Sequence, residues 1–258
     1  MRQSADAPVA VLSPHLDDAV LSAWTVLRRQ VAVTVINVCA GIPPAGLETP
    51  WDRLTGARDG ADRVRERLAE DRAALGRAGR GAVNLDFLDE QYRAGPLDPD
   101  ALVEAIGAAV PQAAELWAPA GIGAHSDHLQ VREAALALAR GGGPPVRLYA
   151  ELPYAVRYGW PEWVAGRRTR TGLDLDGWMR AYLPDGTAVP GERHELSRAE
   201  ARAKLRALRE YRTQWLALDT ATRVSGRRVI RYEASFAAGS ASMSSSSATK
   251  RSSENRIA

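Results

Sequence analysis

Near its N-terminus the chain reads Val9-Ala10-Val11-Leu12-Ser13-Pro14-His15-Leu16-Asp17-Asp18, and the expected architecture grows outward from this stretch. Its first four residues form a continuous apolar run, which is typical of a strand buried on both faces of a parallel sheet. A helical pattern follows from Ala19 to Arg29. The polar residues between them therefore lie at the carboxyl end of a strand, where open α/β sheets place their ligand sites.

A second stretch repeats this arrangement. Gly121-Ile122-Gly123-Ala124-His125-Ser126-Asp127-His128 follows the short apolar run Leu116-Trp117-Ala118 and precedes a helical pattern from Leu129 to Arg140. We refer to residues 13–18 as the first turn and to residues 121–128 as the second turn. Three of the four histidines of the chain lie in these two turns, close to aspartates, and core packing does not explain that distribution.

Strand and helix patterns alternate through about the first 150 residues. Further strands are expected at Val31–Cys39, Ala82–Leu88, Glu115–Ala118 and Val146–Leu152. Helices are expected at Arg58–Gly79 and after Asp98. Such alternation implies right-handed crossovers, and hence a Rossmann-like, mostly parallel sheet flanked by helices. The G-x-G-x-x-G fingerprint of a dinucleotide site is missing from the sequence.

The pattern changes after Leu152, where prolines interrupt short segments. This predicts a smaller C-terminal portion that is irregular or antiparallel. A long helix is expected at Leu196–Asp219 and an edge strand at Val229–Phe236. We expect residues 1–236 to form a single domain. The serine-rich residues 237–258 are expected to be a disordered tail, because they carry too few large apolar side chains to repay the entropy of ordering.

The composition limits the classes of function. The net charge of +3 comes from arginines interleaved with acidic residues along helices, which is typical of a solvated helix face, so no nucleic-acid partner is expected. No apolar run approaches a membrane span, and the N-terminus lacks the apolar core of a signal peptide, so we expect a cytoplasmic protein. The single cysteine, Cys39, excludes an internal disulfide and is expected to be buried. The oligomeric state is left open.

The segment from Ala40 to Thr55 is longer than a connection needs and is a candidate lid. Four tryptophans in this segment and in the C-terminal portion either stack on a sugar or cover the core: Trp51, Trp160, Trp163 and Trp178. The remaining histidine, His194, has no acidic constellation of the same kind around it and is expected on the surface.

The residue types of the two turns predict a metal site. Catalytic zinc takes three protein ligands from histidine and carboxylate side chains and leaves a position for water, and His15, Asp18 and His128 supply that set. Iron(II) or another divalent metal also fits it. Bound zinc lowers the pKa of water from ~15.7 to about 7. Asp17 lies between two candidate ligands in the sequence and is free to take a proton from that water.

The other polar residues of the second turn complete the hypothesis. His125 could stabilise a developing oxyanion or protonate a departing amine, and Asp127 could hold one of the imidazoles in the correct tautomer. Together the residues predict metal-assisted hydrolysis of an acyl bond. A purely structural interpretation is the alternative, because Asp17 or Asp18 alone would more often be a helix cap, and a lone histidine is more often structural.

Pro14-His15-Leu16-Asp17-Asp18 and Gly123-Ala124-His125-Ser126-Asp127-His128 together resemble the signature of the PIG-L/LmbE family of metal-dependent N-deacetylases. Further similar positions are Arg67-x-x-Glu70, Ala74-Leu75-Gly76, Phe87-Leu88-Asp89, Glu151-Leu152-Pro153-Tyr154, Lys204 and Tyr211-Arg212-Thr213-Gln214. The resemblance covers roughly residues 9 to 236. It implies a Rossmann-like hydrolase that removes an acetyl group from the nitrogen of an N-acetylglucosamine-type sugar. Its partner would be a small amino-sugar glycoside or natural-product intermediate.

The resemblance also implies roles for individual residues. His15, Asp18 and His128 would be the metal ligands, Asp17 the general base and His125 the general acid or oxyanion partner. Arg67 and Asp89 would contact sugar hydroxyls. The chain departs from the pattern at one position, since some relatives carry a tyrosine two residues before the histidine that matches His125, where this chain has Gly123. Either the metal and His125 suffice, or another group enters the site.

Two other functions remain open from the sequence. His15-Leu16-Asp17 with a distant histidine also fits the two-His, one-carboxylate triad of iron(II) oxygenases. Such sites in 2-oxoglutarate enzymes lie on β-sandwich strands, and a requirement for 2-oxoglutarate would identify one. The second alternative is a non-catalytic sugar-binding module, which a complete absence of bound metal would favour.

Overall fold

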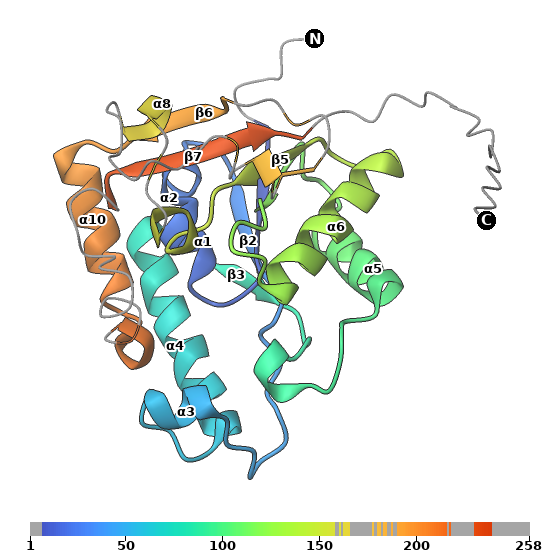
Figure 1. The fold of residues 1–258 in the computed structure, drawn as a ribbon, viewed down its shortest axis with the longest axis vertical. Coiled ribbons are helices and arrows are strands. Elements are labelled where there is room, and N and C mark those ends of the chain that lie inside the picture. The colour runs from blue at the N-terminus through green and yellow to red at the C-terminus, as the bar shows by residue number, and fades with distance from the viewer. Residues whose placement is uncertain are drawn as a thin grey trace, which may run out of the picture.

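The computed structural model describes residues 7–157, 160, 162–165, 177, 180–181, 183–184, 187, 190–215, 217 and 230–238, with only the backbone given for residues 156, 157 and 165. Within them the strands form one sheet in the order β3-β2-β1-β4-β5-β7-β6 (Figure 1). The strands are β1 (Val9–Ser13), β2 (Val33–Asn37), β3 (Ala82–Asn84), β4 (Glu115–Pro119), β5 (Val146–Tyr149), β6 (Glu192–Glu195) and β7 (Tyr232–Ala237). β1 to β5 run parallel, and β7 is antiparallel to both of its neighbours.

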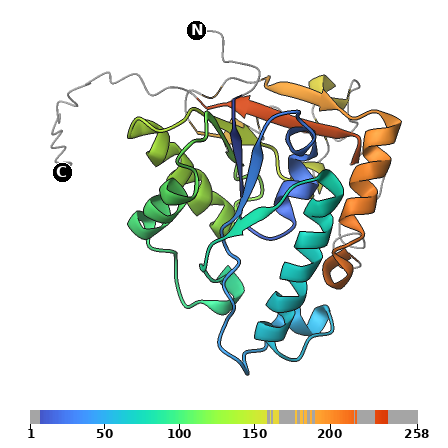
Figure 2. The same cartoon turned by 180° about the vertical axis from the view of Figure 1, so that it is seen from behind.

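Helices cover both faces of this sheet. α5 and α6 pack together on one face, while α4 and α10, with the short α1 and α2, lie on the other (Figures 1 and 2). The helices are α1 (Asp18–Ser22), α2 (Trp24–Leu27), α3 (Pro50–Leu54), α4 (Gly60–Ala78), η1 (Glu90–Tyr92), α5 (Pro99–Ala109), α6 (Ser126–Arg140), α7 (Tyr154–Arg157), α8 (Glu162–Ala165) and α10 (Arg198–Leu208). The predicted Rossmann-like, mostly parallel sheet flanked by helices is confirmed.

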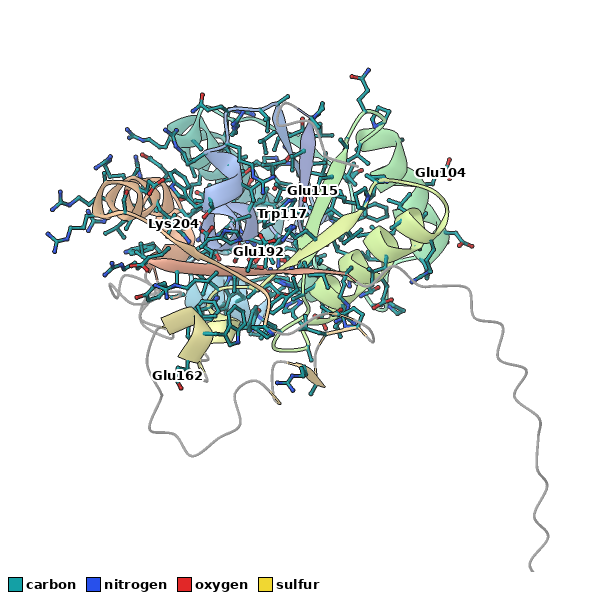
Figure 3. All side chains as sticks on the ribbon, turned by 90° about the horizontal axis from the view of Figure 1, so that it is seen from above. Glu104, Glu115, Trp117, Glu162, Glu192 and Lys204 are labelled. Atoms are coloured by element: carbon teal, nitrogen blue, oxygen red, sulfur yellow. The ribbon has the colours of Figure 1, made fainter. Side chains whose placement is uncertain are left out.

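The central strand β1 is buried along its whole length, as its apolar sequence predicts. Val11 pairs with Val35 of β2 on one side and with Trp117 of β4 on the other. On β4, the indole N–H of Trp117 donates to a carboxylate oxygen of Glu115 at 2.7 Å (Figure 3). Each fully buried aliphatic side chain contributes roughly 1.5–3 kcal/mol, so the strand that carries the first turn is firmly held.

The expected helix boundaries on α4 and α5 are confirmed in the side-chain caps. The Asp59 carboxylate accepts the first free N–H groups of α4, and Gly79 ends that helix with φ of 72°. Asp98 caps α5 in the same way. These local signals were readable because both partners of each cap lie within a few residues of one another.

The predicted helix at residues 19–29 is instead broken at Ala23. The cause lies far away in the sequence. Glu233 of β7 accepts the backbone N–H groups of Trp24 and Thr25, both at 2.9 Å, and thereby caps α2. The same carboxylate forms a buried ion pair with the Lys204 ammonium of α10 at 2.6 Å. Glu233 thus joins α2, α10 and β7.

Two C-terminal predictions are wrong. The helix expected at Leu196–Asp219 is interrupted after Leu208, where the chain turns and buries the Tyr211 side chain, and helical structure resumes at residues 212–215. The strand expected at the edge is an inner strand, since β7 lies between β5 and β6. Ala237, which was assigned to the tail, pairs with Arg147 as the last residue of β7. Residues 239–258 lie outside the described part of the chain.

The second, third and fifth strands are shorter than predicted, since β2 covers only Val33–Asn37, β3 ends at Asn84 and β5 ends at Tyr149. Beyond β2 and β3, an isolated bridge joins Cys39 and Asp86. The surface assignment of His194 is also wrong, since its ring is half-buried on β6 and its Nε2 lies 2.9 Å from the Ser235 hydroxyl. Cys39 is buried, as expected. Of the helices described, none is both long and apolar enough to cross a membrane.

The tryptophans divide between core and cavity. Trp160 is buried in the hydrophobic core, and Trp163 packs edge-on against Phe236. The core interpretation is therefore confirmed for these two. Trp51 borders a cavity, and Trp178 lies outside the described residues.

Candidate active site

β1 and β4 are neighbours in the sheet, so the two predicted turns meet at its carboxyl edge. A cavity of about 410 Å³ opens between them. It is lined by seven of the eight predicted site residues: His15, Asp17, Asp18, Arg67, Asp89, His125 and His128. The eighth, Asp127, has no exposed surface and lies beneath the others.

The first turn is held by its own residues. The Ser13 hydroxyl donates to the carbonyl of His15 at 2.5 Å and accepts the N–H of Ala19 at 3.0 Å. Asp18 accepts the backbone N–H of His15 at 2.8 Å, which closes the turn. Asp17 stands at the N-cap of α1, yet within the described chain its side chain makes no capping hydrogen bond. The cap interpretation of Asp17 is therefore wrong, and its carboxylate remains available to the cavity.

The three predicted ligands converge. One donor atom each from His15, Asp18 and His128 lies within 4.8 Å of the other two. His15 Nδ1 and His128 Nε2 are each 3.4 Å from the same carboxylate oxygen of Asp18. Two imidazoles and one carboxylate form a donor set that divalent transition metals accept, with room for further ligands.

The remaining ring nitrogens of the two histidines are held by other carboxylates. His15 Nε2 lies 2.9 Å from Asp127 Oδ2, and His128 Nδ1 lies 3.2 Å from Glu151 Oε1. Each bond fixes its ring so that the opposite nitrogen faces Asp18. A carboxylate behind each ligand imidazole is the usual support of a metal-binding histidine.

The electrostatics favour positive charge between the ligands. Burial lowers the pKa of both imidazoles, but the carboxylates around them outweigh it, so the pKa values of His15 and His128 lie above the usual value. Burial alone would raise the pKa of Asp18, yet His128 and His15 hold it at about 2. A divalent cation would supply the charge that this arrangement prefers, and the donor set therefore fits a metal.

Asp17 lies beside this group in a different environment. Burial and the neighbouring Asp18 raise its pKa, and Arg67 opposes that shift from 4.0 Å. Arg67 also lies 3.6 Å from Asp89, and all three side chains border the cavity. The structure thus places the two residues expected to contact a sugar next to the expected base.

The second turn has an unusual backbone. Gly121, Gly123 and Ala124 have positive φ values of 82°, 94° and 57°. α6 then begins at Ser126, earlier than predicted, with His125 as its N-cap. Because His125 Nδ1 accepts the N–H of Asp127 at 3.3 Å, the ring proton belongs on Nε2. Burial and the other two histidines lower the pKa of His125, so this ring favours the neutral form.

Asp127 connects both turns to the loop after β3. Its carboxylate accepts the N–H of Glu90 at 3.0 Å and pairs with the Arg93 guanidinium, in addition to its bond to His15. Asp127 was expected to hold the imidazole of His125 or of His128, and in the structure its carboxylate bonds His15 instead.

Three residues at the site were missing from the set predicted by the sequence. Glu151 is fully buried, and besides His128 its carboxylate accepts the N–H groups of Gly121 at 2.6 Å and Ile122 at 3.2 Å. Its position just after β5, like that of the two turns after their strands, was the available signal. Tyr154 lies in the stretch Glu151-Leu152-Pro153-Tyr154, which the resemblance already included without a role for it, whereas nothing in the local sequence of Arg93 points to the site.

The candidate lid is tied down at two points. Asp52, which forms a capping box with Thr49 at the start of α3, accepts the Tyr92 hydroxyl at 2.7 Å. The Trp51 indole N–H on that helix donates to Gln214 at 2.7 Å, and both residues line the cavity. Opening or closing of this segment remains a prediction.

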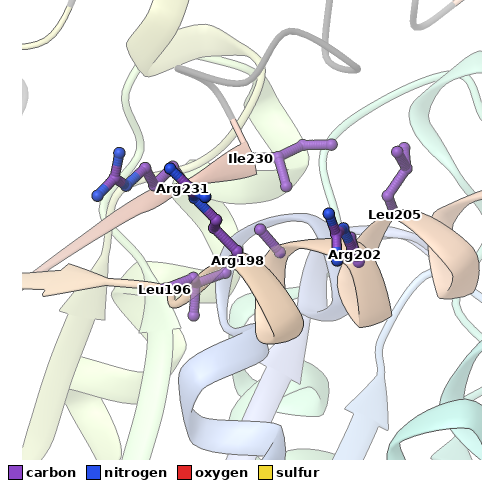
Figure 4. A pocket seen from close by; sticks show the side chains of 7 residues that line it. Leu196, Arg198, Arg202, Leu205, Ile230 and Arg231 are labelled. Atoms are coloured by element: carbon purple, nitrogen blue, oxygen red, sulfur yellow. The ribbon is translucent and has the colours of Figure 1, made fainter.

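A second cavity, of about 400 Å³, lies beside α10 (Figure 4). Apolar side chains and arginines line it: Leu196, Arg198, Ala201, Arg202, Leu205, Ile230 and Arg231. Guanidinium groups are poor metal ligands, so the metal chemistry belongs to the cavity between the two turns.

Solved deacetylases share the fold of this chain over most of its length. The A40926 pseudoaglycone deacetylase superposes with a TM-score of 0.67 over 91% of this chain and 97% of that one, at 27% identity. Teicoplanin deacetylase in complex with teicoplanin gives 0.65 over 90% and 97%, at 25% identity. Its zinc-inhibited form gives 0.69 over 92% and 100%, at 23% identity.

A comparison with curated sequences also finds a deacetylase. The 2'-N-acetylparomamine deacetylase of Streptomyces fradiae is 32% identical over 166 residues, which are 56% of this chain. The match spans 57% of that relative, less than two thirds of its length. No family model matches the chain. The likenesses confirm the resemblance to the PIG-L/LmbE deacetylases, whereas the oxygenase and the binding module gain no support from them.

Proposed function

We propose that this protein is a metal-dependent N-deacetylase that hydrolyses the acetyl amide of an N-acetylglucosamine-type sugar. The observation that carries the proposal is the three-ligand group with the uncapped Asp17 beside it in one cavity. Names of relatives support a small glycoside or natural-product intermediate as substrate, since one acts on 2'-N-acetylparomamine and others on the A40926 pseudoaglycone and in teicoplanin biosynthesis.

His15, Asp18 and His128 would hold the metal. A divalent cation there would act as a Lewis acid toward the acyl oxygen and lower the pKa of a water molecule. We propose zinc or iron(II). The zinc-inhibited form of teicoplanin deacetylase is a reason to test several metals rather than zinc alone.

Asp17 is the proposed general base. Its carboxylate takes a proton from the attacking water and returns it to the departing nitrogen, so the amide and water yield acetate and a free amine. Burial raises its pKa, which suits a base working near neutral pH, and general-base help of this kind contributes roughly 10²–10⁴-fold. Arg67 and Asp89 would receive the sugar hydroxyls next to it.

His125 is the proposed oxyanion donor. With its proton on Nε2 and its pKa lowered, the ring is a neutral N–H donor, which favours oxyanion stabilisation over protonation of the amine. Asp127 and Glu151 would keep the ligand rings of His15 and His128 in register.

Metal content and acetate release test the proposal. Wild type, Asp18→Ala and the exposed control Asp62→Ala would be purified without added metal and analysed for elements, then supplied with zinc, iron(II) or cobalt(II). We expect about one metal ion per chain in wild type and control, and none in Asp18→Ala. Acetate release from N-acetylglucosaminides should follow the metal. Absence of metal from the wild type even after supply would contradict the proposal.

A further inference from the structure

Tyr154 borders the proposed active site but takes no part in the roles assigned so far. It is the first residue of α7, which follows β5, and its ring lines the same cavity as the ligand histidines. The ring stands edge-on to His128, with centroids 5.6 Å apart, and lies 6.4 Å from the ring of His125. Tyr154 is therefore beside both His125 and His128 at the wall of the cavity.

The hydroxyl of Tyr154 differs from those of the buried tyrosines. Tyr92, Tyr149 and Tyr211 each donate to a protein oxygen at 2.7 to 3.0 Å. For Tyr154, the described residues provide no such acceptor. A phenol next to a cavity normally has a hydrogen-bond partner, and the cavity itself is where that partner would be bound. At neutral pH the phenol keeps its proton, since its ordinary pKa is about 10, so it is a donor.

Gly123 accounts for the place of this ring. A Cβ atom at Gly123 would lie 2.6 Å from Cδ1 and 2.8 Å from Cγ of Tyr154, distances that no real side chain tolerates. The ring of Tyr154 thus fills the space that a side chain at position 123 would take. Positions 123 and 154 therefore cannot both place an aromatic side chain in this space.

The position of Tyr154 is fixed by its neighbours. Glu151, three residues before it, holds the backbone of Gly121 and Ile122 through its carboxylate. The Leu152 N–H donates to the Ser22 hydroxyl at 2.9 Å. The segment that carries Tyr154 and the turn that carries His125 are therefore joined, and such preorganisation is what a donor to a transition state requires.

We propose that the Tyr154 hydroxyl donates a hydrogen bond to the acyl oxygen of the substrate as that oxygen gains negative charge, next to the N–H of His125. Position 123 is a glycine because a side chain there would occupy the space of the Tyr154 ring. The inference rests on the proposed deacetylase function. It assigns a catalytic donor to a strand end different from the one that the family pattern indicates.

Tyr154→Phe tests this inference, because it keeps the ring against Gly123 and removes only the hydroxyl. Loss of one oxyanion donor costs about 10²–10³-fold in kcat, and we expect that loss with little change in KM and an unchanged metal content. Tyr232→Phe, on β7 and outside the cavity lining, is the matched control and should behave as wild type.

Binding of a tetrahedral analogue gives a readout separate from turnover. The methylphosphonamide of a glucosaminide carries its charge on oxygens that mimic the oxyanion, so its affinity should fall by a factor similar to that in kcat. Affinity for the product amine, which lacks those oxygens, should stay the same in isothermal titration calorimetry.

The possible results distinguish a failure of the Tyr154 assignment from a failure of the proposed deacetylase function. Unchanged kcat and analogue affinity in Tyr154→Phe would overturn the inference and leave the deacetylase intact. Loss of metal from Tyr154→Phe would also overturn it, since the residue would then support the metal group. No acetate release by metal-loaded wild type would overturn the function and this inference together.

Discussion

The first and second turns carry the same types of residue but are held in different ways. In the first turn, Ser13 and Asp18 bond to backbone groups only a few residues away. The second turn has three positive φ values in a row of four residues and relies on Glu151, which is 23 residues beyond His128. The proposed base, Asp17, therefore comes from the turn that is stabilised by local hydrogen bonds. The proposed oxyanion donor, His125, comes from the turn that is stabilised by a residue distant in the sequence.

Both turns are also backed by a buried carboxyl group from another element. Glu151 bonds the second turn directly. Asp71 of α4 acts on the first turn through Tyr211, whose hydroxyl lies 2.7 Å from Asp71 and 3.0 Å from the carbonyl of Leu16. One hydroxyl hydrogen cannot serve both oxygens. If Tyr211 donates to Leu16, Asp71 must carry the proton, and burial raises the pKa of Asp71 to about 7.

The largest effect is expected in the first turn, from Asp17→Asn. Asparagine has the same shape but cannot take a proton, so turnover should fall by roughly 10²–10⁴-fold while the metal stays bound. His128→Ala in the second turn should lose both metal and turnover. Steady-state acetate release and elemental analysis on the same preparations distinguish the two. Near-normal deacetylation by Asp17→Asn would remove the assignment of the base.

A smaller effect is expected from Glu151→Gln behind the second turn. Glutamine replaces one carboxylate oxygen by an NH₂ group, which cannot accept a hydrogen bond. Either a backbone N–H of the second turn or His128 Nδ1 would then lose its acceptor, so the support of the His128 ring is weakened. Metal affinity should fall by about 10–100-fold, measured by competition with a chelator. Glu133→Gln, exposed on α6, is the matched control. Equal affinities for both variants would show that the second turn holds itself, as the first does.

The smallest effect is expected from Asp71→Asn behind the first turn, and it is a change in pH dependence. The folded protein keeps the Asp71 proton up to about pH 7, whereas the unfolded chain loses it near 3.9, so this contribution to stability is full at low pH and declines as pH rises. Between pH 6 and 8 the wild type should lose about 1 kcal/mol more unfolding free energy than the variant. Urea unfolding at both pH values measures this, and parallel curves would contradict a protonated Asp71.

The same contrast explains what the sequence could predict. The buried β1 and the capped α4 depend on residues close together in the chain, and their patterns were readable. The break at Ala23, by contrast, depends on Glu233, more than 200 residues away.

The candidate site also contains residues that the sequence could predict and residues that it could not. The ligand types and their spacing pointed to His15, Asp18 and His128, because strand ends collect at one edge of a parallel sheet. The resemblance included Glu151 and Tyr154, but the sequence did not reveal that Glu151 supports His128 or that Tyr154 lines the cavity. Arg93, which pairs with Asp127, has no motif of its own. The partner of the Asp127 carboxylate could not be predicted either, because His15 lies 112 residues away and is brought to Asp127 only by the packing of β1 beside β4.

The inner position of β7 has a consequence for synthesis of the protein on the ribosome. Every proposed ligand, the base and Tyr154 lie before residue 155, yet β5 lacks its outer partner until Tyr232–Ala237 has emerged. Until then the growing chain presents an unpaired strand edge, which is a template for aggregation. A product that ends before Tyr232 would also leave Lys204 buried without Glu233, so such truncated chains should accumulate in inclusion bodies even though all of the proposed chemistry is already encoded in them.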